Sequence, residues 1–341
     1  MSKRANIILF SLCAVGALLL AISIGGARIS LREIIAVFAY RIFRVPLPDG
    51  FSRIVPGVIW YIRLPRVMMG FLVGAALAVS GTVMQSVLKN PLASSYTIGV
   101  SAGAGLGAVI IIVTGVSSGL LGMFLMPAAA ITAGMGTVFL AVWLASRVDR
   151  GLDNFAIVLM GMVLSIFMNA IMMTLAARNS QHAQQIVAWQ LGSFSGANWT
   201  EVAIVAAVSI VMVVALVRFA REMDVLTFGD EQAGAIGVEV RRVKLALILL
   251  SSVLTGVAVA FVGIIAFVDL IAPHVARKFV GASHRYVVPV AALFGGTFMV
   301  LADLVSRTFA APAGVPVGSV TALVGAPFFA YIFLRSRKGA S

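Results

Sequence analysis

The stretch YIRLPRVMMGFLVGAALAVSG, residues 61–81, sets two arginines against an apolar run, and this run decides the fold. From Val67 to Leu88 the sequence carries no charged residue. An α-helix needs about 20 apolar residues, at about 1.5 Å of rise each, to cross the hydrocarbon core of a bilayer. The segment therefore predicts a transmembrane helix whose start lies beside Arg63 and Arg66.

The composition of the whole chain indicates the same environment. Of its 341 residues, 61% are hydrophobic and only 11% are charged, which leaves too little polar surface to cover a water-soluble protein of this length. The net charge of +13 does not indicate nucleic-acid binding, because the basic residues form short clusters between apolar runs instead of one basic face. The only cysteine, Cys13, excludes an intramolecular disulfide.

Charged residues divide the chain into successive apolar runs, and the first run is too long for a signal peptide, so we expect a retained anchor. Basic clusters at both termini are typical of the cytoplasmic side, which requires an even number of crossings. The charge-poor region after Lys244 fits one helix and a short return helix that reverse at Gly263. The ten predicted crossings lie near 7–26, 67–88, 98–114, 120–145, 155–177, 202–217, 245–263, 266–279, 286–306 and 316–334.

The predicted fold is thus all-α, a polytopic membrane protein with about ten transmembrane helices in a single domain, 1–341. Glycines at four-residue spacing, such as Gly70 and Gly74 or Gly103 and Gly107, predict helices that approach closely through small-residue faces. With both termini in the cytoplasm, sixteen of the Lys and Arg residues fall inside and nine outside, in agreement with the positive-inside tendency.

One external segment runs against that tendency. Seven of the nine outer arginines crowd into an Arg-rich loop at 27–66, and two of them are Arg63 and Arg66. An ordinary explanation is that such arginines anchor a helix at the membrane interface while their charged ends reach water. The alternative is that they form a surface for an acidic partner.

Residues for catalysis or metal binding are not apparent in the sequence. The three histidines are scattered, and no spacing connects them with a serine, a carboxylate or a metal ligand set. Two carboxylates fall inside predicted crossings: Asp303 is expected to pair with Arg307 one turn later, whereas Asp269 fits either a helix start near the outer surface or a pathway-lining group. We expect no catalytic site, no metal site and no cofactor.

The longest cytoplasmic loop, residues 218–244, carries charges of both signs. Within it, Asp230 can cap a short helix that Gly237 would end in the left-handed conformation. Two helical turns cannot cross a bilayer, but they can lie on its inner face and contact a soluble partner. An ordinary solvated loop is the alternative.

Several segments together resemble the permease subunits of type II ABC importers, the group that handles iron-siderophores, haem and cobalamin. The motifs recur in order from about residue 60 to the C-terminus: IRLPRVMMGFLVGAALAVSGTVMQSVLKNPLA, GVSAGAGLGA, FGDEQAGAIGV, GIIAFVDLIAPHVAR, LADLVSR and VPVGSVTALVGAPFFAYIF. The resemblance implies ten helices per subunit in the inner membrane of a bacterium. It also implies three kinds of partner: a second permease subunit, two cytoplasmic ATPase subunits and an external solute-binding protein.

The resemblance also implies roles for particular residues. The arginines Arg63, Arg66 and Arg307 match those that receive acidic residues of the binding protein. The short helix matches the coupling helix against the ATPase, with Gly229, Asp230, Glu231, Ala233, Gly237 and Val238. The cytoplasmic gate is implied at Asn90 and Leu92, and more weakly at Asp153 and Asn154. Asp269 departs from the small or apolar residue that is common there.

The function that these features favour is inward transport of a bulky metal chelate, an iron-siderophore first and haem or cobalamin next, by alternating access. The chain has no phosphate-binding loop, so ATP hydrolysis is expected on separate subunits and the chain itself is not expected to be an enzyme. The alternatives are an ion-coupled secondary transporter and a membrane scaffold that transports nothing.

Overall fold

The computed structural model describes residues 2–26, 28–48, 51–52, 54–116, 122–149, 151–309 and 314–338. Every regular element in these ranges is helical, which confirms the all-α prediction. Ten helices correspond one by one to the predicted crossings: α1 (Lys3–Ser23), α4 (Leu64–Val87), α5 (Val100–Thr114), α6 (Gly122–Val148), α7 (Asn154–Arg178), α9 (Trp199–Arg218), α12 (Val240–Val262), α13 (Val268–Val280), α14 (His284–Thr308) and α15 (Val317–Lys338).

The ten helices differ in length. Seven helical segments of the described chain are long and apolar enough to cross a membrane. Helix α5 has 15 residues, the apolar stretch of α15 spans Val317–Tyr331, and α13 has only 13 residues. At about 1.5 Å of rise per residue, α13 covers roughly 20 Å, less than a bilayer core. This agrees with the short return helix that the sequence predicts after Gly263, where α12 ends.

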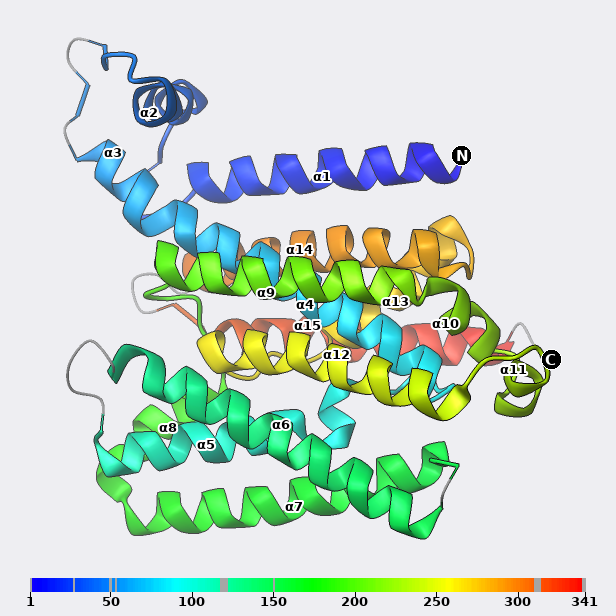
Figure 1. Ribbon diagram of the computed structural model, residues 1–341. Helices are drawn as coiled ribbons and strands as arrows, with labels where there is room; N and C mark the ends of the chain where they lie inside the picture. Colours follow the sequence, from blue (N-terminus) through cyan, green and yellow to red (C-terminus); the bar gives the residue numbers. More distant parts are fainter. Residues whose placement is uncertain are drawn as a thin grey trace.

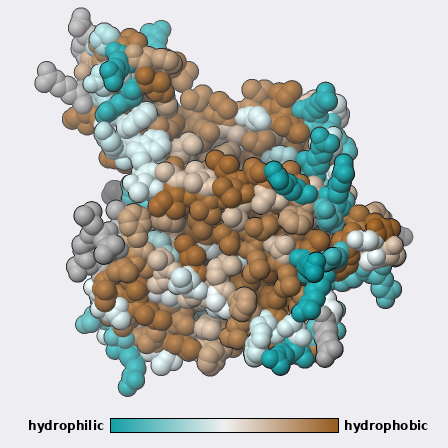
Figure 2. Space-filling view, viewed as in Figure 1, coloured by the Kyte–Doolittle hydropathy of each residue, from teal (hydrophilic) through white to brown (hydrophobic). Residues whose placement is uncertain are grey.

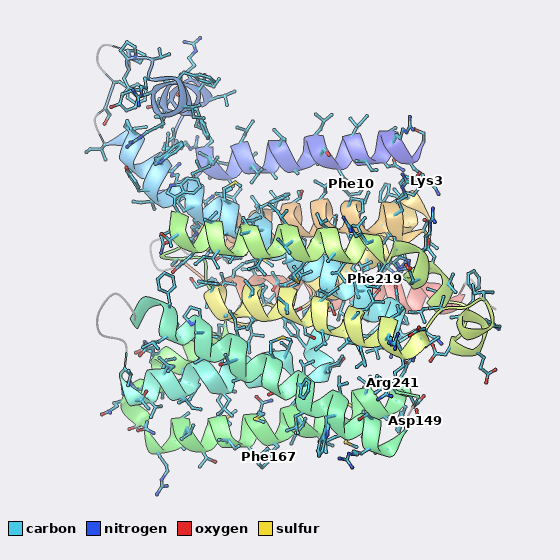
Figure 3. The ribbon with its side chains drawn as sticks, viewed as in Figure 1. Lys3, Phe10, Asp149, Phe167, Phe219 and Arg241 are labelled. Carbon is cyan, nitrogen blue, oxygen red and sulfur yellow. The ribbon has the colours of Figure 1, made fainter. Side chains whose placement is uncertain are left out.

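The bundle has two distinct ends. In Figure 1 the start of α1 and the end of α15 lie at the same end, together with the short helices α10 (Ala220–Leu226) and α11 (Asp230–Ala235). Helix α2 (Leu31–Phe43) lies at the opposite end. We call these the α11 end and the α2 end. Lys3, Asp149 and Arg241 gather at the α11 end (Figure 3), and Figure 2 shows a broad hydrophobic band between the ends.

The segment 27–66 is not a loop throughout, contrary to the prediction. It contains α2, which begins with a capping box in which Ser30 and Glu33 bond to each other's backbone. It also contains the start of the next helix, because α3 (Val55–Gly57) and a π-helical turn (Val58–Arg63) run directly into α4. The helical segment therefore begins at Val55 instead of Val67, and both Arg63 and Arg66 lie inside it.

Small residues set the closest helix contacts, as their spacing predicts. A Cβ atom on Gly74 of α4 would lie 2.3 Å from the carbonyl oxygen of Gly295 in α14. A Cβ atom on Gly107 of α5 would lie 2.3 Å from the carbonyl oxygen of Ala129 in α6. Only glycine fits at such backbone contacts, so α4 packs against α14, and α5 against α6, at backbone distance.

The predicted sidedness can be tested at the turn between α13 and α14, where Ala282 is exposed. In a Cys13→Ser background, we expect Ala282→Cys to react with a membrane-impermeant maleimide only from the cytoplasmic side. The matched control is Leu31→Cys on the exposed surface of α2, which should react only from outside. The reverse pattern would overturn the orientation, and reaction of both from one side would overturn the even number of crossings.

Candidate functional site

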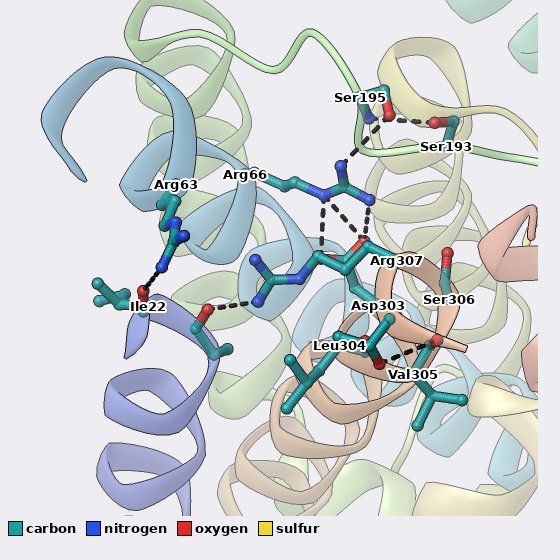
Figure 4. A network of polar contacts seen from close by, with 12 residues as sticks. Ile22, Arg63, Arg66, Ser193, Ser195, Asp303, Leu304, Val305, Ser306 and Arg307 are labelled. Carbon is teal, nitrogen blue, oxygen red and sulfur yellow. Dashed lines mark hydrogen bonds and ion pairs between the residues drawn. The ribbon is translucent and has the colours of Figure 1, made fainter. Parts of the chain in front are cut away.

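The α2 end holds a cluster of three arginines around one carboxylate (Figure 4). Asp303 of α14 accepts hydrogen bonds from Arg66 of α4, from Nε at 3.1 Å to each oxygen and from Nη2 at 2.8 Å. Arg307 Nε lies 3.6 Å from the second Asp303 oxygen. The predicted Asp303–Arg307 pair is therefore present, but Arg66 is the closer partner. Asp303 is 3% exposed in its side chain, so this carboxylate fixes both arginines.

The three predicted docking arginines differ in exposure. The side chains of Arg66 and Arg307 keep 22% and 13% of their surface exposed, and both line a cavity of about 410 Å³ with Ser193 and Ser195. Arg63 is 6% exposed. Its Nη1 donates to the carbonyl oxygens of Ile22 at 2.7 Å and Ser23 at 3.0 Å. Arg63 thus satisfies the last carbonyl groups of α1, as a basic residue does at a helix C-terminus.

At the α11 end, one carboxylate connects the short helix to the bundle. Asp230 is the first residue of α11 and does not cap it, because Gly229 precedes the helix and no side chain caps it. Instead, Asp230 pairs with Lys89 at 2.7 Å and with Lys244. Burial raises the pKa of Asp230, but the hydrogen bonds from Lys244 and Lys89 outweigh burial and leave the pKa below its ordinary value. Asp230 is therefore ionised at neutral pH.

Lys244 at the start of α12 is the buried centre of this contact. Its side chain is 0% exposed. Besides Asp230, its ammonium group donates to Asn154 Oδ1 at 2.8 Å and to the Leu152 carbonyl at 3.3 Å. Lys244 therefore joins α11 to the start of α7. The sequence analysis missed Lys244, because Arg241 and Arg242 precede it and nothing in the sequence distinguishes it from them.

The predicted gate loops both lie beside α11. Asn90 forms a tight turn in which its Oδ1 accepts from the Leu92 N–H at 2.9 Å, and the preceding residue, Lys89, carries the ion pair to Asp230. Asp153 is the N-cap of α7 and accepts from the N–H groups of Phe155 and Ala156. The structure thus brings together, around Asp230, two loops that are more than 60 residues apart in the chain.

The remaining residues of the predicted coupling motif shape α11. Ala233 is fully buried, whereas Glu231 is exposed. Gly237 has φ +92°, which confirms the predicted left-handed end, and the Val238 N–H returns to the Ala233 carbonyl at 3.0 Å. This is the bond pattern of a helix that ends in a left-handed residue. The exposed surface of α11 therefore faces away from the bundle.

The left-handed position gives a test of this geometry. We expect Gly237→Ala to destabilise the α11 turn by about 1 kcal/mol, because an L-residue with a Cβ atom is strained at this φ. Gly234 lies within α11, and a Cβ atom there would meet nothing within 4 Å. The control Gly234→Ala should therefore leave the turn intact or stabilise it slightly. Hydrogen–deuterium exchange of peptides covering residues 226–240 measures both effects, and equal exchange in the two variants would contradict this account.

A Ser–His–Asp arrangement that the sequence analysis did not find lies near the same end. His284 at the start of α14 is 2.5 Å from Asp224 Oδ1 of α10 through Nδ1, and 2.5 Å from Ser86 Oγ of α4 through Nε2. The order resembles a hydrolytic triad. However, Ser86 and His284 are only 2% and 1% exposed, so a substrate cannot reach the hydroxyl. The arrangement instead joins α4, α10 and α14.

Asp269 lies at the start of α13, as one of the two interpretations of the sequence predicts, but it is not near the outer surface. The backbone of Asp269 packs against Gly81, where an added Cβ atom would lie only 1.9 Å from the Asp269 carbonyl oxygen. Gly81 is in the second half of α4, away from the end at Leu64 that lies beside the arginine cluster. Its carboxylate is 3% exposed and accepts a hydrogen bond from Ser94. Asp269 therefore fixes the start of α13 against the chain after α4.

Comparisons with known proteins agree with this architecture. The profile of the FecCD transport family matches residues 12–335. The chain is 36% identical over 335 residues to an uncharacterized ABC transporter permease protein of Bacillus subtilis, YvrB, and covers 94% of it with 98% of its own length. It is 37% identical to the hemin transport permease HmuU of Yersinia pestis, with 83% of this chain and 85% of HmuU covered.

A solved structure extends the agreement to three dimensions. The chain superposes with a TM-score of 0.85 and 29% identity on an inward-facing conformation of a metal-chelate type ABC transporter, covering 97% of this chain and 99% of that one. The cobalamin import permease BtuC of Halobacterium salinarum is 38% identical over 302 residues, which cover 87% of this chain and 78% of BtuC. The chain therefore belongs to the FecCD transport family, as a multi-pass permease with the fold of type II ABC importers.

Proposed function

We propose that this permease imports a bulky metal chelate across the cytoplasmic membrane by alternating access, driven by ATP hydrolysis on separate subunits. The observation that carries the proposal is the contact of Asp230 with both Lys89 and Lys244. Through it, a short helix at the membrane surface is tied to two loops and to a long transmembrane helix. A force applied to α11 by an ATPase would reach both predicted gate loops directly.

The proposed partners follow from the two ends of the bundle. One of the two ATPase subunits would contact α11 through the exposed Glu231 and the turn at Gly237. An external binding protein would contact the α2 end through Arg66 and Arg307, since the planar guanidinium group binds carboxylates in a bidentate manner. A second permease subunit would complete the pathway, and both termini would lie in the cytoplasm. Arg63 would act by holding α1 in place instead of touching the binding protein.

The proposed substrate class rests on the relatives of the chain, which include cobalamin, hemin and iron(3+)-hydroxamate import permeases. We propose an iron-siderophore first and haem or cobalamin next. An ion-coupled mechanism has less support, because the two carboxylates buried in the described helices, Asp269 and Asp303, are both held by polar side chains.

Uptake by cells that lack the gene tests the proposal. We expect loss of uptake of an iron-hydroxamate, with haem and cobalamin as parallel probes, and recovery when the gene is restored. The rate of uptake should fall when the cellular ATP concentration falls. It should persist when an uncoupler removes the proton gradient while the ATP concentration is maintained. Uptake that collapses with the gradient at constant ATP would support ion coupling instead, and normal uptake of all three probes would overturn the proposed substrate class.

A further inference from the structure

An apolar groove of about 370 Å³ lies at the α2 end, between α1 and the helices beside it. One wall is formed by α1, with Val15, Leu18, Leu19 and Ile22. The first and last of these residues are seven positions apart, or about 10 Å along the helix axis. The groove therefore runs from the end of α1 toward the middle of the bilayer, in the direction that an acyl chain takes.

The opposite wall and the roof have different chemistry. Leu64 and Met68 of α4 continue the apolar wall, and Phe38, Trp60 and Trp199 cover its outer part. The two tryptophan rings lie 5.5 Å apart, and Trp199 Nε1 donates to the Trp60 carbonyl at 2.8 Å. Tryptophan pairs of this kind, with an apolar body and a satisfied polar atom, are typical of the depth where lipid headgroups meet hydrocarbon.

A cation lies close to one of the tryptophans that line the groove. Arg41, in the last turn of α2, lies 5.9 Å from the centre of the Trp60 ring and 5.2 Å from that of Tyr61. The arginine is exposed to solvent, and no carboxylate of the described residues forms an ion pair with it. An anion held there would lie beside Trp60, which lines the apolar groove. Only an amphipathic ligand matches both parts.

We propose that this groove binds one acyl chain of an anionic phospholipid whose phosphate is held by Arg41. The combination of an apolar channel along the membrane normal, an aromatic roof at interface depth and a cation at its mouth matches such a lipid. The proposal also gives a role to Arg41, one of the arginines at 27–66, which would hold the lipid headgroup. It is independent of the transported substrate and of the sites for the ATPase and the binding protein.

Tryptophan quenching by brominated lipids tests the proposal, because two of the four tryptophans line the groove. The full chain with Trp143→Phe and Trp189→Phe retains only Trp60 and Trp199. In detergent micelles, brominated phosphatidylglycerol should quench the fluorescence of this pair saturably. The lipid concentration that gives half of the maximal quenching, the half-point, should be at least about threefold lower than for brominated phosphatidylcholine. Equal half-points for the two lipids would overturn the proposed headgroup site.

Matched variants separate the two parts of the site. Arg41→Gln should remove the preference for phosphatidylglycerol, whereas Arg32→Gln on the same helix should retain it. A preference that survives Arg41→Gln would overturn the role of Arg41.

Val15→Phe, which narrows the groove, should raise the half-points for both lipids at least about threefold. Leu12→Phe, an exposed position on α1 outside the groove, should not. Unchanged half-points in Val15→Phe would overturn the acyl-chain site.

A protein occupant of the groove predicts a different result. In a Cys13→Ser background, Leu19→Cys lies in the groove wall and is 38% exposed as leucine. We expect no disulfide-linked dimer of this variant when membranes that contain the assembled transporter are oxidised. A dimer formed in high yield would show that a second copy of the chain covers the groove, and the lipid proposal would be wrong.

Discussion

Asp230→Asn is expected to reduce ATP-driven uptake by the assembled transporter to background. The substitution removes the charge that compensates Lys244, whose side chain is fully buried. Breaking a buried ion pair by removing one partner costs about 3–5 kcal/mol, and we expect the lower half of this range because Asp230 itself is 36% exposed. The α11 turn should then separate from the loop at Leu152 and Asn154, so that ATP hydrolysis no longer moves the permease.

Two controls make this prediction specific. Glu239→Gln removes a carboxylate from the same loop, but its pair with Arg242 is exposed and contributes little, so stability and uptake should stay normal. Replacing both members of the buried pair, Asp230→Asn with Lys244→Met, should recover much of the lost thermal stability without recovering uptake. Thermal unfolding of the purified permease and uptake in vesicles measure the two effects. Normal uptake by Asp230→Asn would contradict the proposed coupling route.

Arg66→Gln is expected to weaken binding of the external binding protein at least about tenfold, which corresponds to about 1.4 kcal/mol. Truncation of one member of a desolvated charge pair in an interface costs about 2–5 kcal/mol, and Arg66 would lose part of that energy to its internal partner, Asp303. Binding to the purified complex in nanodiscs, at two salt concentrations, measures the affinity. The wild-type complex should bind more weakly at the higher salt.

Asp303→Asn and Arg63→Gln are the matched controls. Asp303→Asn breaks the same Arg66–Asp303 pair but leaves both arginine charges, so binding-protein affinity should be retained or increased. Arg63→Gln removes the bonds to the end of α1, so it should lower thermal stability while affinity per folded complex is unchanged. Equal loss of affinity in Arg66→Gln and Asp303→Asn would show that the arginine cluster is structural.

The sequence predicted the parts of the fold that depend on local composition. Apolar length and charge placement predicted nine of the ten helices, because a bilayer requires a similar apolar length of each crossing, whereas the short α13 was predicted from the even number of crossings that the basic termini require. The same approach missed the helical character of 31–43 and 55–66. Arginine density made these residues look like a loop, whereas internal partners such as Asp303 and the α1 carbonyls let the helix continue past Arg63 and Arg66.

The candidate site was predictable only in part. The family motif located α11, and Gly237 has the conformation that its position requires. The residues that hold α11 were not predictable, because Lys89 and Lys244 meet Asp230, and Asn154 meets Lys244, only after four separate segments have packed. The same holds for His284, Asp224 and Ser86, which lie on three elements and share no spacing in the sequence.

The contact of α4 with α14 has a mechanical consequence. The two helices are joined at one end by Arg66 and Asp303, near the middle by Gly74 against Gly295, and at the other end by Ser86 and His284. Three contacts spread along about 30 Å hold α4 and α14 together as one rigid pair. The hydrogen bond between His284 and Asp224 connects this pair to α10. Spin–spin distances between the two helices should therefore stay constant through the transport cycle. A movement of α10 at the α11 end would then tilt the arginine cluster together with the two helices, without a series of local changes between them.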